Sequence, residues 1–340
     1  MNYLKMLDSV KIKEYLLVQG VDIVGFHLLN GNHDEYYNHL NQKKINNNLY
    51  PRKVNTNDYA NYNKVVKNAK TLISIGICYN NQINKNNNKN IGYYSKISHG
   101  IDYHVIVNEK LLLLKKYILQ SNGNAKIYTC CDTGILDDRY ISYLCGNGFY
   151  GKNSMIINEE FGPSVVYGSL VCDIEINNIS NHQVISKCLD CNLCEKACPT
   201  NSLANYQLSY HTCLSYLTQT SKMIDLDLLQ DSFYGCDICN DVCIYQNNNI
   251  NHQCFNDIGY FDLLKLIKMN KQEYQNCFSK KSLSWLNFNI IKKNALLLYV
   301  KNNNLNKDEL LNLKQELSNA HLLNSKILQD TFNYLLERND

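Results

Sequence analysis

Proline is scarce in this chain of 340 residues, where it occurs only three times. Turn signals based on proline are therefore weak, and the short runs of asparagine are best read as surface loops. All apolar runs are shorter than the roughly 20 residues that a membrane-spanning helix needs, so the sequence predicts a soluble protein without a membrane partner. The formal net charge of +3 is too small to indicate a nucleic-acid binder by itself, and it does not exclude one.

The beginning of the sequence has no signal-peptide pattern, because Met1-Asn-Tyr-Leu-Lys runs directly into an amphipathic helical pattern. Fifteen cysteines without an export signal predict a reducing, cytoplasmic location, where thiolates are free to bind metal. With 45% hydrophobic residues, a chain of this length can bury sizeable cores, and we expect two or three domains.

Cysteine is concentrated between positions 188 and 243. Residues 188–199 read C-x2-C-x2-C-x3-C-P, and residues 236–243 read C-x2-C-x3-C. In bacterial ferredoxins, the first three cysteines of such a run hold one iron–sulfur cluster and the fourth holds its neighbour. The eight cysteines then form two sets of four: Cys188, Cys191, Cys194 and Cys243 in one, and Cys198, Cys213, Cys236 and Cys239 in the other.

Two other interpretations of these cysteines are weaker. A structural zinc site takes two C-x2-C pairs and four ligands in all, whereas here three thiols crowd into seven positions. A disulfide framework is typical of small exported domains, and this chain is too long to need one. The spacing therefore favours two 4Fe–4S clusters over zinc, disulfides or buried free thiols.

Alternating strand and helix patterns run through the first half of the chain. Residues 71–79 are nearly all apolar, as in a central strand that is buried on both faces. We leave residues 30–68 as helix or loop. The other predicted elements are helices at 3–19, 103–119 and 137–144, and strands at 21–26, 126–131, 155–158 and 164–172.

The pattern changes after the cysteines. From Tyr260 onward the strand signal vanishes, and helices are predicted at 263–269, 290–300, 308–317 and 325–336, possible pairs of a solenoid. We therefore predict an α+β protein of three domains: an α/β catalytic domain at 1–180, a cluster domain at 181–250 and a helical domain at 251–340.

Three polar motifs lie upstream of the cysteines, at the ends of predicted strands or helices. They are Gly100-Ile-Asp102-Tyr103-His104, Cys131-Asp132-Thr133-Gly134 and Gly151-Lys152-Asn153-Ser154. A sheet would deliver them to a common edge, which is the usual location of a ligand crevice. Taken singly, an Asp-Thr-Gly sequence is more often a turn than a catalytic acid, and a lone lysine is usually solvated.

Taken together and in order, these motifs resemble the epoxyqueuosine reductase family. The resemblance extends to about residue 246, and the segment KKNALLLYVKN at 292–302 is similar to helices of the family's C-terminal HEAT-like domain. The motifs that carry it are DYH at 102–104, DTG at 132–134, GKN at 151–153, CPT at 198–200, CLSYLTQT at 213–220 and YGCDICNDVC at 234–243.

The resemblance implies an enzyme that reduces epoxyqueuosine at the wobble position of a tRNA to queuosine. It also implies base-off cobalamin in a nitroreductase-like first domain, two 4Fe–4S clusters in a ferredoxin-like second domain, and tRNA docking on the third. Removing the epoxide oxygen as water takes two electrons and protons, and no side chain is a low-potential reductant, so such cofactors are needed. We expect a monomer that takes electrons from an unidentified donor.

Site residues follow from the same resemblance. Asp132 would be the general acid, with a pKa raised by a partly apolar pocket, and would also contact cobalamin. Asp102 and His104 are better explained as a hydrogen-bonded structural pair. The resemblance further implies cobalamin contacts from Ser95, Ile156, Tyr167, Ser215 and Asp237, for which core packing explains each position equally well. It implies tRNA contacts from Lys222, and we expect phosphate contacts from Lys292 and Lys293.

The sequence departs from the family pattern at three places. Ile244 stands where a proline usually follows the last cluster cysteine, and His99 stands where a tryptophan is common. The basic residue that the family directs at its cofactor has no clear counterpart, although Arg52 or Tyr59 could take its place. Two alternative functions stay open: a reductive dehalogenase-like enzyme for a small organic substrate, and a non-catalytic two-cluster electron carrier.

Overall fold

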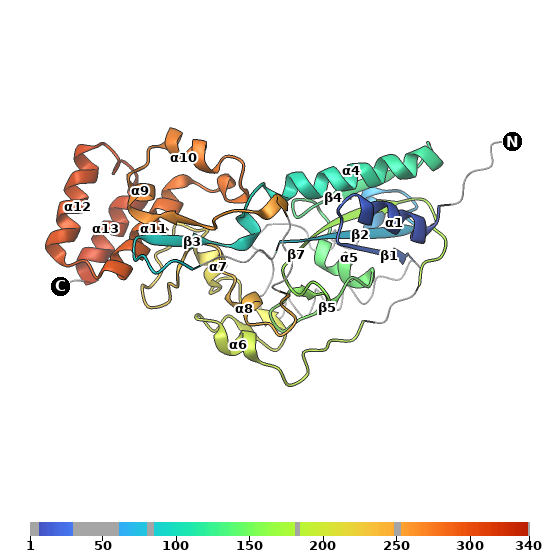
Figure 1. Cartoon of the computed structure of the whole chain (residues 1–340), viewed down its shortest axis with the longest axis horizontal. Helices are drawn as coiled ribbons and strands as arrows, with labels where there is room; N and C mark the ends of the chain where they lie inside the picture. The colour runs from blue at the N-terminus through green and yellow to red at the C-terminus, as the bar shows by residue number, and fades with distance from the viewer. Residues whose placement is uncertain (1–6, 30–60, 80–84, 181–183, 248–252, 339–340) are drawn as a thin grey trace.

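A computed structural model describes residues 7–29, 61–79, 85–180, 184–247 and 253–338. The molecule is elongated, with a sheet-containing end near the N-terminus, a helical end near the C-terminus and the cysteine-rich segment between them (Figure 1). Arg52 and Tyr59 lie outside the described residues. Within the described ranges, none of the helices is both long enough and apolar enough to cross a membrane.

The sheet at the N-terminal end has four strands in the order β1-β2-β7-β4, and all of its pairings are antiparallel. Every residue of β2 and β7 is buried, which confirms the prediction for residues 71–79. The four strands are β1 Ile23–Leu28, β2 Thr71–Cys78, β4 Ile127–Cys130 and β7 Val165–Cys172.

Helices cover both faces of this sheet. Helices α1 (Ser9–Val18) and α4 (Tyr103–Ser121) pack on one face, where they bury Ile73, Ile75 and Ile77 of β2. Helices α3 (Tyr62–Val65) and α5 (Asp138–Leu144) pack on the other face, against Leu72 and its neighbours. Successive side chains of β2 point to opposite faces, and both faces are covered, which explains why the strand sequence is apolar without interruption.

A second sheet joins three distant parts of the chain. Its strands are β3 (Ile91–Tyr94), β10 (Ser232–Tyr234) and β11 (Tyr260–Asp262), with β3 in the middle. Strand β11 shows that the expected loss of strand structure after Tyr260 was wrong. It has three residues, directly followed by a helix, and is too short to display a period of two.

Five helices form the C-terminal end: α9 (Leu263–Lys268), α10 (Lys271–Phe278), α11 (Phe288–Asn303), α12 (Lys307–Asn319) and α13 (Lys326–Arg338). Four of them confirm predicted helices. The prediction missed α10 because it is mostly polar; it is started by a capping box of Asn270 and Glu273 and buries only Tyr274 and Phe278.

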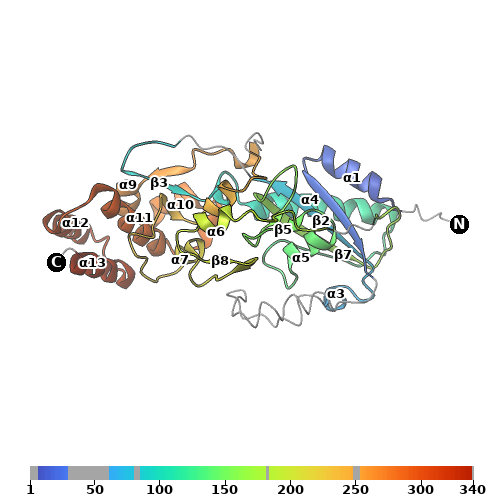
Figure 2. The ribbon, with the colours of Figure 1, turned by 90° about the horizontal axis from the view of Figure 1, so that it is seen from below.

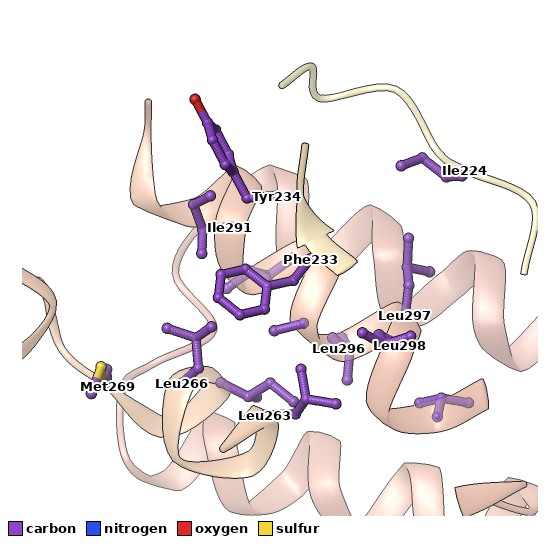
Figure 3. Packing of buried hydrophobic residues seen from close by; sticks show 14 of the residues in the cluster. Ile224, Phe233, Tyr234, Leu263, Leu266, Met269, Ile291, Leu296, Leu297 and Leu298 are labelled. Atoms are coloured by element: carbon purple, nitrogen blue, oxygen red, sulfur yellow. The ribbon is translucent and has the colours of Figure 1, made fainter. Parts of the chain in front are cut away.

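Helix α11 is the centre of the C-terminal core. Figure 3 shows Phe233 of β10 lying between Leu263 and Leu266 of α9 and the leucines of α11. The helix is buried at every position from Ile291 to Leu298, so its sequence does not show the one-sided periodicity of a surface helix.

The burial of α11 corrects the prediction for Lys292 and Lys293. Their exposed fractions are 1% and 0%, so neither can contact a phosphate on the surface. The Lys292 Nζ donates to Met269 O at 3.0 Å, and the Lys293 Nζ donates to Thr220 O and Lys222 O at 2.9 and 2.6 Å. Burial lowers the pKa of both ammonium groups to about 8.

The cysteine-rich segment has little regular structure and lies between the sheet end and the helical end (Figure 2). Its short elements are α6 (Leu193–Ala197), β8 (Leu203–Ala204), β9 (Gln207–Leu208), α7 (Leu214–Leu217) and α8 (Ile238–Asp241). A small hairpin of β5 (Phe149–Tyr150) and β6 (Ile156–Ile157) faces it from the sheet end. Asn294 of α11 ties the segment to the helical end, because its Nδ2 donates to Thr218 O and Phe233 O at 2.6 and 2.9 Å.

Candidate active site and cluster sites

The first set of cysteines surrounds one hollow. Cys188, Cys191, Cys194 and Cys243 all line it, together with Lys152. The first three come from the turn that leads into α6, and Cys243 directly follows α8. Helix α6 contacts helix α8, and this contact brings Cys243 close to the other three cysteines, although it is far from them in sequence.

The second set also gathers in space. Burial raises the pKa of the Cys236 thiol to about 12, with smaller contributions from Asp237 and from the Cys213 and Cys198 thiols. Burial raises the pKa of Cys239 as well, with Cys236 and Cys213 as the closest thiols that contribute. The thiols that raise one another's pKa are Cys188, Cys191, Cys194 and Cys243 on one side and Cys198, Cys213, Cys236 and Cys239 on the other, and Cys194 also acts on Cys239.

The donor chemistry of both sets fits a four-iron cubane, which takes four thiolates. A cubane spaces its thiolates more widely than a single tetrahedral ion does. In the described ranges, no three His, Cys, Asp or Glu side chains are close enough to hold a single metal ion.

Asp132 lies in the turn after β4, with a left-handed backbone (φ of 56°). Its backbone N–H donates to Asp138 Oδ2 at 2.7 Å, and Ser169 Oγ donates to the other oxygen of the same carboxylate. Burial raises the pKa of Asp138 to about 7. Because a left-handed aspartate needs support from its surroundings, Asp138 acts as the anchor of this turn.

Sequence reasoning missed Asp138, because an acidic residue in the first turn of a helix is common and gives no sign of a contact with another turn. Asp137 already caps α5 by accepting from the Arg139 and Tyr140 amides, both at 3.1 Å. Asp138 lies in the first turn of the same helix, and its carboxylate accepts from the Asp132 amide and Ser169 Oγ.

The Asp132 side chain is 56% exposed and lies at the beginning of α4. Tyr103 Oη donates to its Oδ2 at 2.9 Å, and His104 Nε2 lies 3.7 Å from the same oxygen, too far for a hydrogen bond but within ion-pair range. Tyr103 was not among the predicted site residues. The Asp-Tyr-His motif is visible in the sequence, but residue spacing does not reveal that Tyr103, at the beginning of a helix, contacts Asp132 in a separate turn.

His104 is held between two carboxylates. Its Nδ1 lies 2.8 Å from Asp102 Oδ1, which confirms the predicted pair, and Asp102 also caps α4 by accepting from the His104 amide at 3.0 Å. Asp102 and, to a lesser extent, Asp132 raise the pKa of His104 to about 9. The imidazole is therefore protonated at neutral pH, and it holds a proton beside Asp132.

Ser95 and Asp237 lie together. Ser95 Oγ donates to Asp237 Oδ1 at 2.6 Å, and the Lys96 amide donates to Oδ2 at 2.8 Å. Gly235, with a φ of 72°, lets the two segments approach, because a Cβ there would lie 2.4 Å from Ser95 Cβ. The short helix Lys96–Ser98 follows directly, so one stretch of chain links Asp237 to the Asp102–His104 motif.

Ile156 and Tyr167 pack against each other with Ile23 and Val165. Tyr167 is 8% exposed, and its hydroxyl has no hydrogen-bond partner within the described part of the chain. A buried hydroxyl without a partner is costly unless a ligand supplies one. This observation fits a cofactor with many amide groups, such as cobalamin, at the position that the sequence predicted.

The two remaining predicted residues lie in the cysteine-rich segment. Ser215 is partly buried in α7, and its carbonyl accepts from Thr218 Oγ1 and Gln219 Nε2 of the same segment. Lys222 is exposed, and its backbone carbonyl is fixed by the buried Lys293. His99, which replaces a tryptophan of the family pattern, is fully buried, and burial lowers its pKa to about 4.

Comparisons with protein families agree with this arrangement. Residues 187–246 match a family described as a 4Fe-4S double cluster binding domain. Residues 60–133 match a family described as epoxyqueuosine reductase QueG, DUF1730.

Curated relatives carry the same description. The chain is 33% identical over 244 residues to the epoxyqueuosine reductase of Lactococcus garvieae, an alignment that covers 68% of this chain and 69% of the relative. It is 28% identical over 247 residues to the epoxyqueuosine reductase of Listeria monocytogenes, covering 69% of this chain and 65% of the relative.

Solved structures resemble the chain over nearly its whole length. The epoxyqueuosine reductase of Streptococcus thermophilus matches with a TM-score of 0.82 and 25% identity, over 95% of this chain and 88% of that structure. An epoxyqueuosine reductase with a tRNA-Tyr epoxyqueuosine-modified tRNA stem loop matches with a TM-score of 0.82 and 25% identity, over 96% of this chain and 88% of that structure. The mixed α/β fold is therefore that of these enzymes.

Proposed function

The chain belongs to the epoxyqueuosine reductase family, and we propose that it reduces epoxyqueuosine at the wobble position of a tRNA to queuosine. The observation that carries this proposal is the Asp132 carboxylate with a protonated His104 beside it, in a chain where four cysteines line one hollow and further buried cysteines lie next to them. A relative bound to an epoxyqueuosine-modified tRNA stem loop supports the substrate.

The reaction takes two electrons and two protons, and it releases the epoxide oxygen as water while the ring gains a double bond. When bound, cobalamin and the clusters supply low-potential electrons that no side chain provides. Ser95, Ile156, Tyr167, Ser215 and Asp237 would hold base-off cobalamin, Tyr167 through its hydroxyl. The two sets of four cysteines would hold the 4Fe–4S clusters.

The protein's own side chains contribute to the reaction by supplying a proton to the departing oxygen. The His104 imidazolium, 3.7 Å away, would give its proton to the Asp132 carboxylate, and Asp132 Oδ2 would pass that proton to the departing oxygen, which leaves His104 neutral. Tyr103 keeps the carboxylate oriented through its 2.9 Å hydrogen bond, and Asp138 keeps the turn in place. The proposal also includes three domains: a nitroreductase-like domain at 1–180, a ferredoxin-like domain at 181–250 and a HEAT-like domain at 251–340. It further includes a monomeric state and an unidentified electron donor.

Anaerobic reconstitution tests the proposal directly. We expect about eight irons per chain and bound corrin, as the ligand count requires. With a chemical reductant, an epoxyqueuosine-containing anticodon stem loop should lose one oxygen, which mass spectrometry of the digested nucleosides detects. A protein with iron but no corrin and no turnover would favour the electron carrier, and turnover of an organohalide in place of the stem loop would favour the dehalogenase.

Lys222 offers a test of RNA docking. Its exposed ammonium projects from a backbone that Lys293 fixes, so a phosphate could meet a pre-positioned charge. We expect Lys222→Ala to weaken stem-loop binding, and to reduce the slope of log affinity against log salt by about 1. Fluorescence anisotropy at several salt concentrations measures both. An unchanged slope, equal to that of the distant surface variant Lys116→Ala, would exclude this contact.

A further inference from the structure

The turn Gly151–Ser154 has no part in the chemistry proposed above, yet it is held on several sides. It joins β5 to β6 at the edge of the sheet end, opposite the cysteine-rich segment. Arg139 Nη1 donates to Ser154 O, and Ser154 Oγ donates to Tyr206 O, both at 3.3 Å. A turn with this much support can present its side chains in fixed positions.

Lys152 reaches from this turn into the loop that carries the first three cysteines. Its Nζ donates to Leu189 O at 2.8 Å and to Asn192 Oδ1 at 2.6 Å. Leu189 has a left-handed backbone (φ of 40°), a conformation that a leucine rarely adopts without external support. The ammonium therefore fixes the loop at its most strained residue.

Asn153 reaches the other half of the same cysteine set. Its Nδ2 donates to Asn240 Oδ1 at 3.1 Å, and Asn240 belongs to α8, three residues ahead of Cys243, whose amide donates to the Asn240 carbonyl. Neighbouring residues of one turn thus hold both chain segments that supply Cys188, Cys191, Cys194 and Cys243.

The position of Lys152 also has an electrostatic consequence. Its side chain lines the same hollow as all four cysteines of the set. The groups that it contacts are the Leu189 carbonyl, the Asn192 amide and the ring of Tyr206, 5.9 Å from its centre, all uncharged. Within the described part of the chain, no carboxylate forms an ion pair with it. Its charge is therefore not cancelled, and it acts on whatever occupies the hollow.

We propose that Lys152 is a positioning residue of the cluster held by Cys188, Cys191, Cys194 and Cys243, and that its charge raises the reduction potential of that cluster. A cluster gains one negative charge on reduction, so a nearby cation stabilises the reduced form. The inference rests on the clusters of the proposed function, but not on its substrate. It would give this cluster a higher potential than the same ligands would have without the lysine.

The test compares Lys152→Gln, which keeps a donor and removes the charge, with Lys152→Arg, which keeps both. A redox titration followed by electron paramagnetic resonance measures both clusters without any turnover. In Lys152→Gln, we expect the reduced-to-oxidised ratio of one cluster at a fixed potential to fall about three- to tenfold, which is about 30–59 mV for one electron. Lys152→Arg and the surface control Lys116→Gln should titrate like the parent.

Each other outcome is informative. Loss of iron from one cluster in Lys152→Gln, but not in Lys152→Arg, would also support the inference. Unchanged potentials with full iron content, a shift of equal size in Lys116→Gln, or loss of iron in both Lys152 variants would overturn it. An iron-free parent protein would contradict the proposed function itself, and failed turnover with a shifted potential would leave this inference standing.

Discussion

Asp132→Asn is expected to lower the turnover of the epoxyqueuosine stem loop by at least about 100-fold, the contribution that a positioned general acid typically makes. Asparagine keeps the size and the turn, but it carries no acidic proton. The iron content should stay at the parent level, because Asp132 lies outside both cysteine sets. Corrin should still bind, because asparagine keeps the size of the Asp132 side chain and the other proposed corrin contacts are unchanged. Single-turnover assays with mass spectrometry measure the chemical step separately from binding.

A second readout needs no turnover. Asp132 contributes to the raised pKa of His104, so in Asp132→Asn that pKa should fall from about 9 while staying above its ordinary value, because Asp102 remains. Nuclear magnetic resonance of the His104 ring follows the titration. Asp173→Asn is the matched control and should change neither value, because Asp173 follows β7 and accepts from the Lys126 amide, at the end of β4 remote from Asp132. Full turnover in Asp132→Asn would remove this residue from the mechanism.

Patterns that depend on local spacing were predictable from the sequence. The two buried strands β2 and β7 appeared as apolar runs, and the cysteine spacing already indicated which thiols gather. The Asp102–His104 pair was also expected, because both residues lie in the first turn of a helix.

Contacts that depend on the environment could not be predicted. Lys292 and Lys293 look like surface lysines, and only the burial of α11 on every side turns them into donors for backbone carbonyls. Tyr103 and Asp138 meet Asp132 because its turn adopts a left-handed backbone, which sequence does not reveal. Strand β3 pairs with β10 and β11, so parts assigned to three domains share one sheet.

Cys239→Ala is expected to remove one cluster and leave the other. Cys239 is deeply buried among the thiols of Cys236 and Cys213, so no other side chain of the set can replace it. Iron should fall from about eight to about four per chain. Turnover should drop to background, because the proposed reaction takes its electrons from the clusters and one of them is missing. Iron analysis and the paramagnetic resonance signal of the remaining cluster measure the loss.

Cys277→Ser is the matched control, because this cysteine is exposed on α10 and lies outside both sets; it should keep all iron and full turnover. Loss of no iron in Cys239→Ala would contradict the assignment of the second set. Loss of all iron would show that the two clusters cannot form separately. With one cluster left, the remaining signal belongs to the set of Cys188, Cys191, Cys194 and Cys243. Combining Cys239→Ala with Lys152→Gln should therefore shift this signal, which assigns the effect of Lys152 to that cluster.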